Sequence, residues 1–271
     1  MNKKLLALYG LKFNPFSQQV PASALWASPP IESFCWRIEQ QAGEGGFALA
    51  VGDPGSGKSA ALRILAERLG TVRDLSLGIL SRPQAQVADF YRELGHLFSV
   101  PLSPHNRWNS AKVLREKWLA HIEASVCRPV LLIDEAQEMN SAVFCELRLL
   151  ASIDLDSRAV SSEIVRGEHR VPQRVEGADR LTHRLEGPDL LPVASRIRSR
   201  LRLDPLTPKD LLEHLQHLLK SAGNPKLLSA SLVQTLCEHA TGNLRLLMNM
   251  AQDLLAAASQ QEREQIDEKL Y

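Results

Sequence analysis

The stretch of sequence that decides the fold is Gly52-Asp53-Pro54-Gly55-Ser56-Gly57-Lys58-Ser59. It matches the pattern G-x-x-x-x-G-K-[ST], in which glycines let the main chain approach phosphate oxygens and backbone N–H groups surround them. In this pattern Lys58 contacts the β- and γ-phosphates, and the Ser59 hydroxyl ligates Mg²⁺. We therefore expect residues 52–59 to bind the phosphates of a nucleoside triphosphate.

The sequence on both sides of this loop predicts the strand and the helix that such a loop requires. Phe47–Val51 is a continuous apolar run bounded by glycines, which is typical of a buried strand in a parallel sheet. Residues 59–69 carry apolar side chains at helical spacing and stop at Gly70, so the loop leads into a helix N-terminus. The order of strand, loop and helix supports a genuine phosphate-binding loop.

A second apolar run, Val130–Ile133, ends in two acidic residues, Asp134 and Glu135. An acid at the end of such a strand completes the Mg²⁺ shell directly or through water, and we assign this role to Asp134. A neighbouring carboxylate can orient the attacking water, which favours hydrolysis, and we assign this role to Glu135. The alternative for Glu135 is an acid that only complements the dipole of the following helix.

The remaining patterns predict an α/β fold, with a three-layer P-loop core around a parallel sheet and a small all-helical lid domain after it. We expect an N-terminal arm and linker helix at residues 1–45, the P-loop core at 46–204 and the helical lid at 205–271. Apart from the elements beside the loop and the acids, the patterns predict a strand at 72–80 and helices at 31–41, 84–99, 109–126, 140–152, 208–222, 232–240 and 244–258. Apart from the helix at 31–41, the first 45 residues are expected to be irregular.

The composition is that of a globular chain. With 271 residues and 44% hydrophobic content, the chain can bury a substantial core. Its apolar runs fall far short of the ~20 residues that cross a bilayer, so we expect a soluble, cytoplasmic protein without membrane insertion. Cys35, Cys127, Cys145 and Cys237 show no C-x-x-C spacing, which predicts buried small apolar residues and neither a zinc site nor a disulfide framework.

Arginine is concentrated in one part of the sequence. Between Arg158 and Arg202 there are ten arginines, no lysine and six acidic residues, although the formal net charge of the whole chain is only +1. Polyanion binding depends on where charges cluster and not on their sum. The cluster is compatible with contacts to nucleic-acid phosphates, and it is also what a solvated surface of mixed charge would contain.

Five stretches of the chain resemble the AAA+ ATPases, in the branch that groups origin-recognition-like initiators, ExeA-type secretion ATPases and the ATPase subunits of transposition systems. They are Tyr9–Phe16, Gly52–Ser59, Asp134–Gln137, Ser195–Arg200 and Gly242–Arg245. The resemblance implies ATP and Mg²⁺ as ligands, and a homo-oligomer with ATP at subunit interfaces. It assigns Arg196 as the arginine finger, with Arg200 as the rival, because a planar charged fork suits a γ-phosphate. It assigns Arg245 as the second sensor of the lid, for which the alternative is a helix-surface arginine.

One segment departs from the family pattern. After Ser157 the family would have an apolar strand that ends in a polar first sensor, whereas Ser161–Arg170 contains only two adjacent strongly apolar residues, Ile164 and Val165. We expect an inserted loop or an altered segment here, and no first sensor can be assigned. A strand missing from the sheet at this point would lower ATPase activity.

Together these features predict an ATP-driven oligomeric switch in which hydrolysis changes the angle between core and lid. In transposition-type relatives such assemblies sit on DNA and act with a transposase, so the resemblance makes duplex DNA and a transposase-type protein the expected partners. The alternative is an ExeA-type secretion or assembly ATPase that acts on protein partners. We rank it lower because such proteins are expected to carry a hydrophobic span and a periplasmic domain, which we do not expect in this chain. A third hypothesis is a nucleotide-binding module that has lost hydrolysis through the altered segment.

Overall fold

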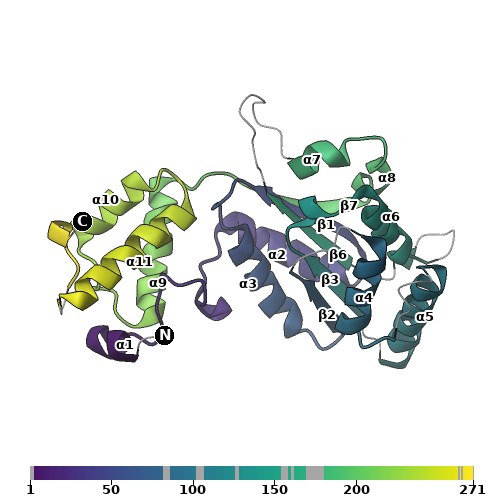
Figure 1. The fold of residues 1–271 in the computed structure, drawn as a ribbon, viewed down its shortest axis with the longest axis horizontal. Helices are drawn as coiled ribbons and strands as arrows, with labels where there is room; N and C mark the ends of the chain where they lie inside the picture. Colours follow the sequence, from purple (N-terminus) through teal and green to yellow (C-terminus); the bar gives the residue numbers. More distant parts are fainter. Residues whose placement is uncertain are drawn as a thin grey trace. The chain divides into compact units, whose positions relative to one another are not determined.

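The structure is a computed structural model, which describes residues 3–81, 86–101, 107–125, 128–153, 158–159, 162–168, 180–261, 263 and 265–270. By their internal contacts the residues form two compact units, and Figure 1 labels their α-helices and the strands of the main sheet. We call residues 29–52 and 61–203 the sheet unit, and residues 1–28, 53–60 and 204–271 the lid unit.

The sheet unit contains, within its described residues, a five-stranded sheet in the order β2-β3-β6-β1-β7, and every neighbouring pair is parallel. Because parallel neighbours cannot be joined by a tight turn, each connection crosses over the sheet, and all five strands end at the same edge. β1 and β3 are buried along nearly their whole length. The strands are β1 (Gly46–Gly52), β2 (Leu75–Leu80), β3 (Arg128–Ile133), β6 (Ser162–Glu168) and β7 (Ile197–Leu203).

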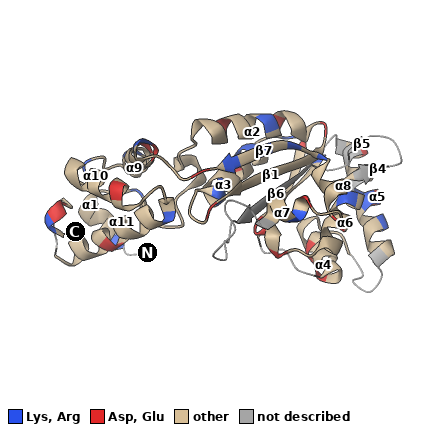
Figure 2. Cartoon of the chain, turned by 90° about the horizontal axis from the view of Figure 1, so that it is seen from above, with Lys and Arg blue, Asp and Glu red and all other residues tan. Residues whose placement is uncertain are grey.

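Helices cover both faces of this sheet. Figure 2 shows α2 on one side of the strands and α4 and α6 on the other, which gives the three layers that the sequence predicts. A short antiparallel pair, β4 (Ser152–Ile153) and β5 (Arg158–Ala159), follows α6. The helices are α2 (Pro29–Ala42), α3 (Lys58–Gly70), α4 (Val87–Leu97), α5 (Arg107–Ser125), the 3-10 turn η2 (Ala136–Glu138), α6 (Ser141–Leu150), α7 (Arg180–Leu185) and α8 (Leu191–Ala194).

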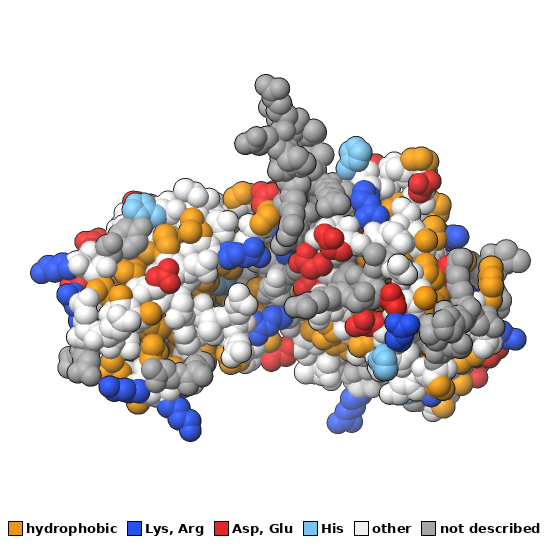
Figure 3. Space-filling view, in the orientation of Figure 1, with side chains coloured by type: hydrophobic (Ala, Val, Ile, Leu, Met, Phe, Trp, Pro, Cys, Tyr) orange, Lys and Arg blue, Asp and Glu red, His pale blue; other side chains and the backbone are white. Residues whose placement is uncertain are grey.

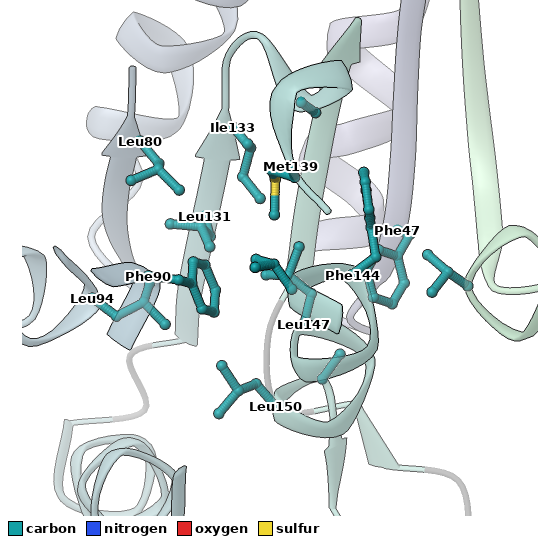
Figure 4. Close-up of a cluster of buried hydrophobic side chains, with 14 of the residues drawn as sticks. Phe47, Leu80, Phe90, Leu94, Leu131, Ile133, Met139, Phe144, Leu147 and Leu150 are labelled. Carbon is teal, nitrogen blue, oxygen red and sulfur yellow. The ribbon is translucent and has the colours of Figure 1, made fainter. Parts of the chain in front are cut away.

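One large apolar cluster fixes α4 and α6 on the sheet (Figure 4). Because successive strand side chains point to opposite faces, alternate residues of β1 and β3 enter this cluster, and β2 adds Leu80. Phe144 is fully buried, so Phe144→Ala should lower the free energy of unfolding by about 3–5 kcal/mol. The labelled members are Phe47, Leu80, Phe90, Leu94, Leu131, Ile133, Met139, Phe144, Leu147 and Leu150.

The lid unit is helical. Thr207 caps α9 through a capping box with Asp210, and the helix ends at Gly223 with a φ of +101°. Trp26 packs edge-on against His214 with 5.7 Å between ring centroids, and burial beside His217 lowers the pKa of His214 to about 4. The lid helices are α1 (Lys3–Tyr9), the 3-10 turn η1 (Ala22–Ala24), α9 (Pro208–Ala222), α10 (Ala230–His239), α11 (Leu244–Gln260) and the 3-10 turn η3 (Glu268–Leu270).

The N-terminal residues pack with the lid helices. Tyr9 and Phe16 are buried in the apolar cluster of the lid, and the Lys12 N–H donates to the carbonyl of Ala222 at 2.8 Å. The expectation of an irregular start is wrong for residues 3–9, which form α1. The reason is tertiary, because Leu5 and Leu6 pack against that same cluster and stabilise a helix too short to persist alone.

The segment that departs from the family pattern contains a strand, β6, that the sequence did not predict. β6 lies in the middle of the sheet, paired with β1 from Gly46↔Ser162 to Gly52↔Glu168 and with β3 on its other edge. A strand in this position has main-chain hydrogen bonds on both sides, and these hold it whether or not its side chains are strongly apolar. Residues 160–161 and 169–179, which belong to the segment where an inserted loop or an altered sequence is expected, lie outside the described residues.

Two of the three described cysteines are buried, as predicted. Cys35 and Cys237 are buried and Cys145 is half-buried, while Cys127 lies outside the described residues. Burial raises the pKa of the Cys35 thiol to about 11, so this thiol stays protonated and unreactive at neutral pH.

Of the helices in the described part of the chain, none is both long and apolar enough to cross a membrane.

Candidate nucleotide-binding site

The loop after β1 has the backbone shape that the phosphate-binding pattern predicts. Gly55 and Gly57 have φ angles of +86° and +97°, a region that glycine occupies without the steric cost of a Cβ. The Ser56 N–H donates to the Asp53 carbonyl at 3.1 Å, which closes a tight turn. The local sequence therefore produces the loop, because glycine occurs at both positions that need a positive φ.

Two side chains of this loop test whether it fits a phosphate group. The Lys58 ammonium is buried and donates to the Asp53 carbonyl at 2.8 Å, so it lies against the loop. The Ser56 hydroxyl is buried without a hydrogen-bond partner, a state that costs ~1–3 kcal/mol. A phosphate oxygen would accept from both groups. The loop residues thus fit a phosphate in charge, in hydrogen bonding and in backbone shape.

Asn243 contacts the phosphate-binding loop, which sequence reasoning did not predict. Its Nδ2 donates to the Pro54 carbonyl at 3.3 Å, and the N–H of Leu244 donates to the Gly55 carbonyl at 3.0 Å. A Cβ on Gly55 would lie 2.1 Å from the Asn243 Oδ1. Asn243 also caps α11 by accepting from the Leu246 N–H at 3.1 Å. The same residue therefore starts the helix and closes over the loop.

Arg245, the proposed second sensor, lies in the first turn of α11 and is exposed. Arg245 is two residues after Asn243. The contacts of Asn243 and Leu244 with the phosphate-binding loop place the start of α11 beside this loop. Gly52 is the buried last residue of β1, and Ser59 is exposed in the first turn of α3.

The two acids follow β3 directly. The Asp134 N–H donates to the Leu80 carbonyl at 2.9 Å, which extends the pairing of β2 with β3 by one residue. β1 and β3 are separated only by β6, so their axes lie roughly 10 Å apart at the spacing of neighbouring strands. The phosphate-binding loop follows one of these strands and the acids follow the other, at one edge of the sheet.

Glu135 has an unusual backbone. Its φ is +55°, in the left-handed region, which costs a residue with a Cβ roughly 1–2 kcal/mol. Such strain persists only where surrounding contacts impose it, and it is concentrated at functional sites. The sequence gives no sign of this strain, because the left-handed position here is not a glycine.

Two side chains that sequence reasoning missed hold the turn that carries Glu135. The Gln137 Nε2 donates to the Glu135 Oε2 at 2.6 Å. Arg184, on α7, donates from Nη1 to the Gln137 carbonyl and from Nη2 to the Met139 carbonyl, both at 2.8 Å. Its guanidinium carbon also lies 5.6 Å from the centre of the Phe144 ring, a favourable cation–π distance. The only sequence signal was that Gln137 and Arg184 lie in stretches already singled out.

The two candidate arginine fingers lie near each other in the chain and are both exposed. Arg196 is in the turn between α8 and β7, where its Nη1 donates to the Pro192 carbonyl at 2.7 Å. Arg200 is on β7, and its carbonyl accepts from the Arg37 guanidinium at 3.4 Å. Both side chains are exposed on the sheet unit, as a finger for a neighbouring subunit would need to be.

Residues 40–175 match the family model described as AAA domain, and this span is half of the 271 residues. It includes both the phosphate-binding loop and the two acids. The chain belongs to the AAA domain family. The predicted resemblance to the AAA+ ATPases is thereby confirmed.

A curated relative of this AAA domain protein is the general secretion pathway protein A of Aeromonas hydrophila. The two are 27% identical over 219 residues, which cover 79% of this chain and 37% of that protein. The chain therefore spans well under half of the relative's length.

Solved structures of related fold include Cdc6p from Pyrobaculum aerophilum, with a TM-score of 0.71, 16% identity and coverage of 93% of this chain and 67% of that one. Drosophila ORC bound to DNA gives a TM-score of 0.68 and 17% identity over 98% of this chain and 63% of that one. RuvB of Thermotoga maritima, a Holliday junction branch migration motor, gives 0.55 and 14% over 95% and 71%. At these identities the likeness establishes the fold: a P-loop AAA+ core with a helical lid.

Proposed function

We propose that the chain is a Mg²⁺-dependent ATPase that works as an oligomeric switch, with ATP bound between neighbouring subunits. The observation that supports this most strongly is the arrangement at one edge of the sheet. A loop shaped for phosphate follows β1, and Asp134 and a strained Glu135 follow β3 of the same parallel sheet.

Each residue of the site has a distinct task in this proposal. The main chain from Gly52 to Ser59 and the Lys58 ammonium would bind the phosphates. The Ser59 hydroxyl and Asp134 would hold Mg²⁺, which neutralises charge on the phosphate oxygens. Glu135 would orient the attacking water and take up its proton.

Two arginines complete the proposed site. Arg196 from a neighbouring subunit would stabilise the charge that develops on the γ-phosphate. Arg245 would contact the phosphates from the lid. Because Asn243 and Leu244 bond directly to the Pro54 and Gly55 carbonyls, a shift of the loop on nucleotide binding would be passed to α11. This connection supports a switch in which the lid responds to the nucleotide.

We propose duplex DNA and a transposase-type protein as the partners of this switch. The alternation of β7 exposes Arg198, Arg200 and Arg202 on one side of an edge strand, and Arg198 is paired with Glu44 at 3.1 Å. On the face in Figure 3, basic side chains are separated by acidic and uncharged ones. The exposed arginines of β7 would contact DNA phosphates and not base edges, so DNA binding should be nonspecific and sensitive to salt.

The alternative is an ATPase that acts on protein partners. The identity of 27% with a secretion pathway protein favours this alternative, and the solved structure of ORC bound to DNA favours DNA as the partner. The two hypotheses differ in whether DNA changes the ATPase rate.

The test is the ATPase rate with and without duplex DNA, over a range of protein concentrations and with or without Mg²⁺. We expect the rate per subunit to rise with concentration, to require Mg²⁺ and to increase with DNA. The affinity for DNA should fall steeply between 50 and 200 mM salt. A rate that DNA leaves unchanged at all concentrations would favour the protein-partner alternative. Lys58→Ala protein, prepared identically, measures contaminating ATPase.

A further inference from the structure

Glu135, Gln137, Arg184 and Phe144 form a connected group of side chains in the sheet unit. Gln137, which is 3% exposed, links them because its side chain bonds to Glu135 and its carbonyl accepts from Arg184. The group joins the turn after β3 to α7, since Arg184 lies 47 residues after Gln137 in the chain. We call it the Glu135 support group.

We propose that Gln137 and Arg184 are positioning residues that set the orientation of the Glu135 carboxylate for attack by water. This proposal rests on the ATPase function proposed above. Gln137 acts on the carboxylate directly, through the 2.6 Å bond to Oε2. Arg184 acts through the backbone, because it holds the Gln137 and Met139 carbonyls, one within the turn and one directly after it.

The strained backbone at Glu135 explains why such support is needed. A left-handed φ of +55° is unfavourable for glutamate, so the turn would relax toward an ordinary conformation if nothing held it. The two bonds from Arg184 fix the carbonyls that any relaxation would have to move. Stacking over the Phe144 ring, which is fully buried, fixes the guanidinium in turn.

The geometry also explains why arginine and glutamine are used. A guanidinium presents two N–H groups in a rigid fork and can hold two carbonyls at once, whereas a lysine ammonium lacks this fixed geometry. A carboxamide can donate a bond to a carboxylate without adding a charge that would compete with Mg²⁺. The orientation of Glu135 therefore depends on a contact from a distant helix and on its neighbour two residues away.

The experiment compares kcat, KM and the affinity for a nonhydrolysable ATP analogue in full-length variants. Gln137→Met keeps the volume but cannot donate, and we expect its kcat to fall about 10-fold, within the range expected for a misplaced reacting group. Arg184→Lys keeps the charge but loses the fork, and we expect a smaller fall, about 3- to 10-fold. Affinity for the analogue should stay within about 2-fold of wild type in both, since neither residue belongs to the phosphate-binding loop.

Matched controls come from the same unit. Gln41 is a buried glutamine that donates to the Phe47 carbonyl and accepts from Ser199, and Arg115 donates to the Leu149 carbonyl at 2.9 Å. Gln41→Met and Arg115→Lys disturb comparable bonds away from Glu135. Their kcat values should remain within about 2-fold of wild type.

A double-mutant cycle separates positioning from a merely structural role. If Gln137 acts through Glu135, adding Gln137→Met to Glu135→Gln should lower the residual single-turnover rate by less than about 2-fold. A full 10-fold loss in that background would overturn the proposal, as would wild-type kcat in both support variants. If wild-type protein shows no Glu135-dependent hydrolysis at all, the proposed ATPase function fails instead, so the two failures are distinguishable.

Discussion

Two loops that follow parallel strands of one sheet achieve their shape in opposite ways. The loop after β1 turns on glycines, so Gly55 and Gly57 reach positive φ at little cost. The turn after β3 reaches positive φ at Glu135, which has a Cβ and is held there by Gln137 and Arg184.

The difference follows from what each loop must present. In the proposed ATPase, phosphate would be bound by the main chain, and glycine leaves the main chain accessible. Water would be oriented by a side chain, so the position would need glutamate even though the backbone disfavours it there. On this proposal, binding is encoded locally, while the orientation of the acid depends on residues from a distant helix.

The largest expected effect concerns a residue on neither loop. Arg196→Ala should lower hydrolysis about 10³-fold and leave ATP binding intact, because a finger supplied by a neighbour acts on the transition state. Mixing Arg196→Ala with Glu135→Gln subunits should restore part of the rate at hybrid interfaces. Rates are measured across mixing ratios at constant total protein.

Arg200→Ala and Arg198→Ala are the matched controls for this prediction. Both are exposed arginines of β7, and each should retain most of the rate. If Arg200→Ala loses hydrolysis and Arg196→Ala does not, Arg200 is the arginine finger. If no ratio of subunits recovers any activity, the shared site is ruled out.

An intermediate effect is expected where the loop after β1 depends on glycine. Gly55→Ala should weaken ATP binding about 100-fold, or ~2.7 kcal/mol, because the φ is positive and the added methyl group would lie 2.1 Å from the Asn243 Oδ1. Gly70→Ala is the control, since a Cβ there meets no atom within 4 Å. Calorimetric titration with ATP distinguishes them, and equal affinities in the two variants would contradict the account of this loop.

The smallest effect tests the strain in the turn after β3. Glu135→Gly and Glu135→Ala both remove the carboxylate, so their difference isolates the backbone. We expect the glycine variant to be more stable by about 1 kcal/mol, because only glycine tolerates the left-handed φ freely. Glu138 lies in the same turn but has no positive φ. At this position the alanine variant should be more stable than the glycine variant. Urea unfolding measures all four, and the same order at both positions would argue against strain.

These two loops also show how far the sequence predicts the structure. The sequence predicts the phosphate-binding loop and the acids from signals that lie within a few consecutive residues, flanked by strand and helix patterns. The strands and helices around them were predicted for the same reason, and α9 carries its capping box, proline and terminal glycine in the sequence.

What the sequence did not predict depends on contacts between distant residues. Arg184 reaches the Gln137 carbonyl from a separation of 47 residues, and Asn243 reaches Pro54 from 189. β6 was missed because a central strand is held by main-chain bonds to β1 and β3, which leave no mark on its side-chain pattern. α1 was missed because it depends on the lid cluster that it packs against.

The most direct test of the central claim is a measurement of ATP binding and of the fate of the bound nucleotide, with and without Mg²⁺. Wild-type protein should take up ATP in a Mg²⁺-dependent manner and convert it to ADP. Glu135→Gln should bind equally well and retain intact ATP, whereas Lys58→Ala should not bind. Equal loss of binding in the two variants, or no Mg²⁺-dependent uptake by folded wild-type protein, would contradict the account.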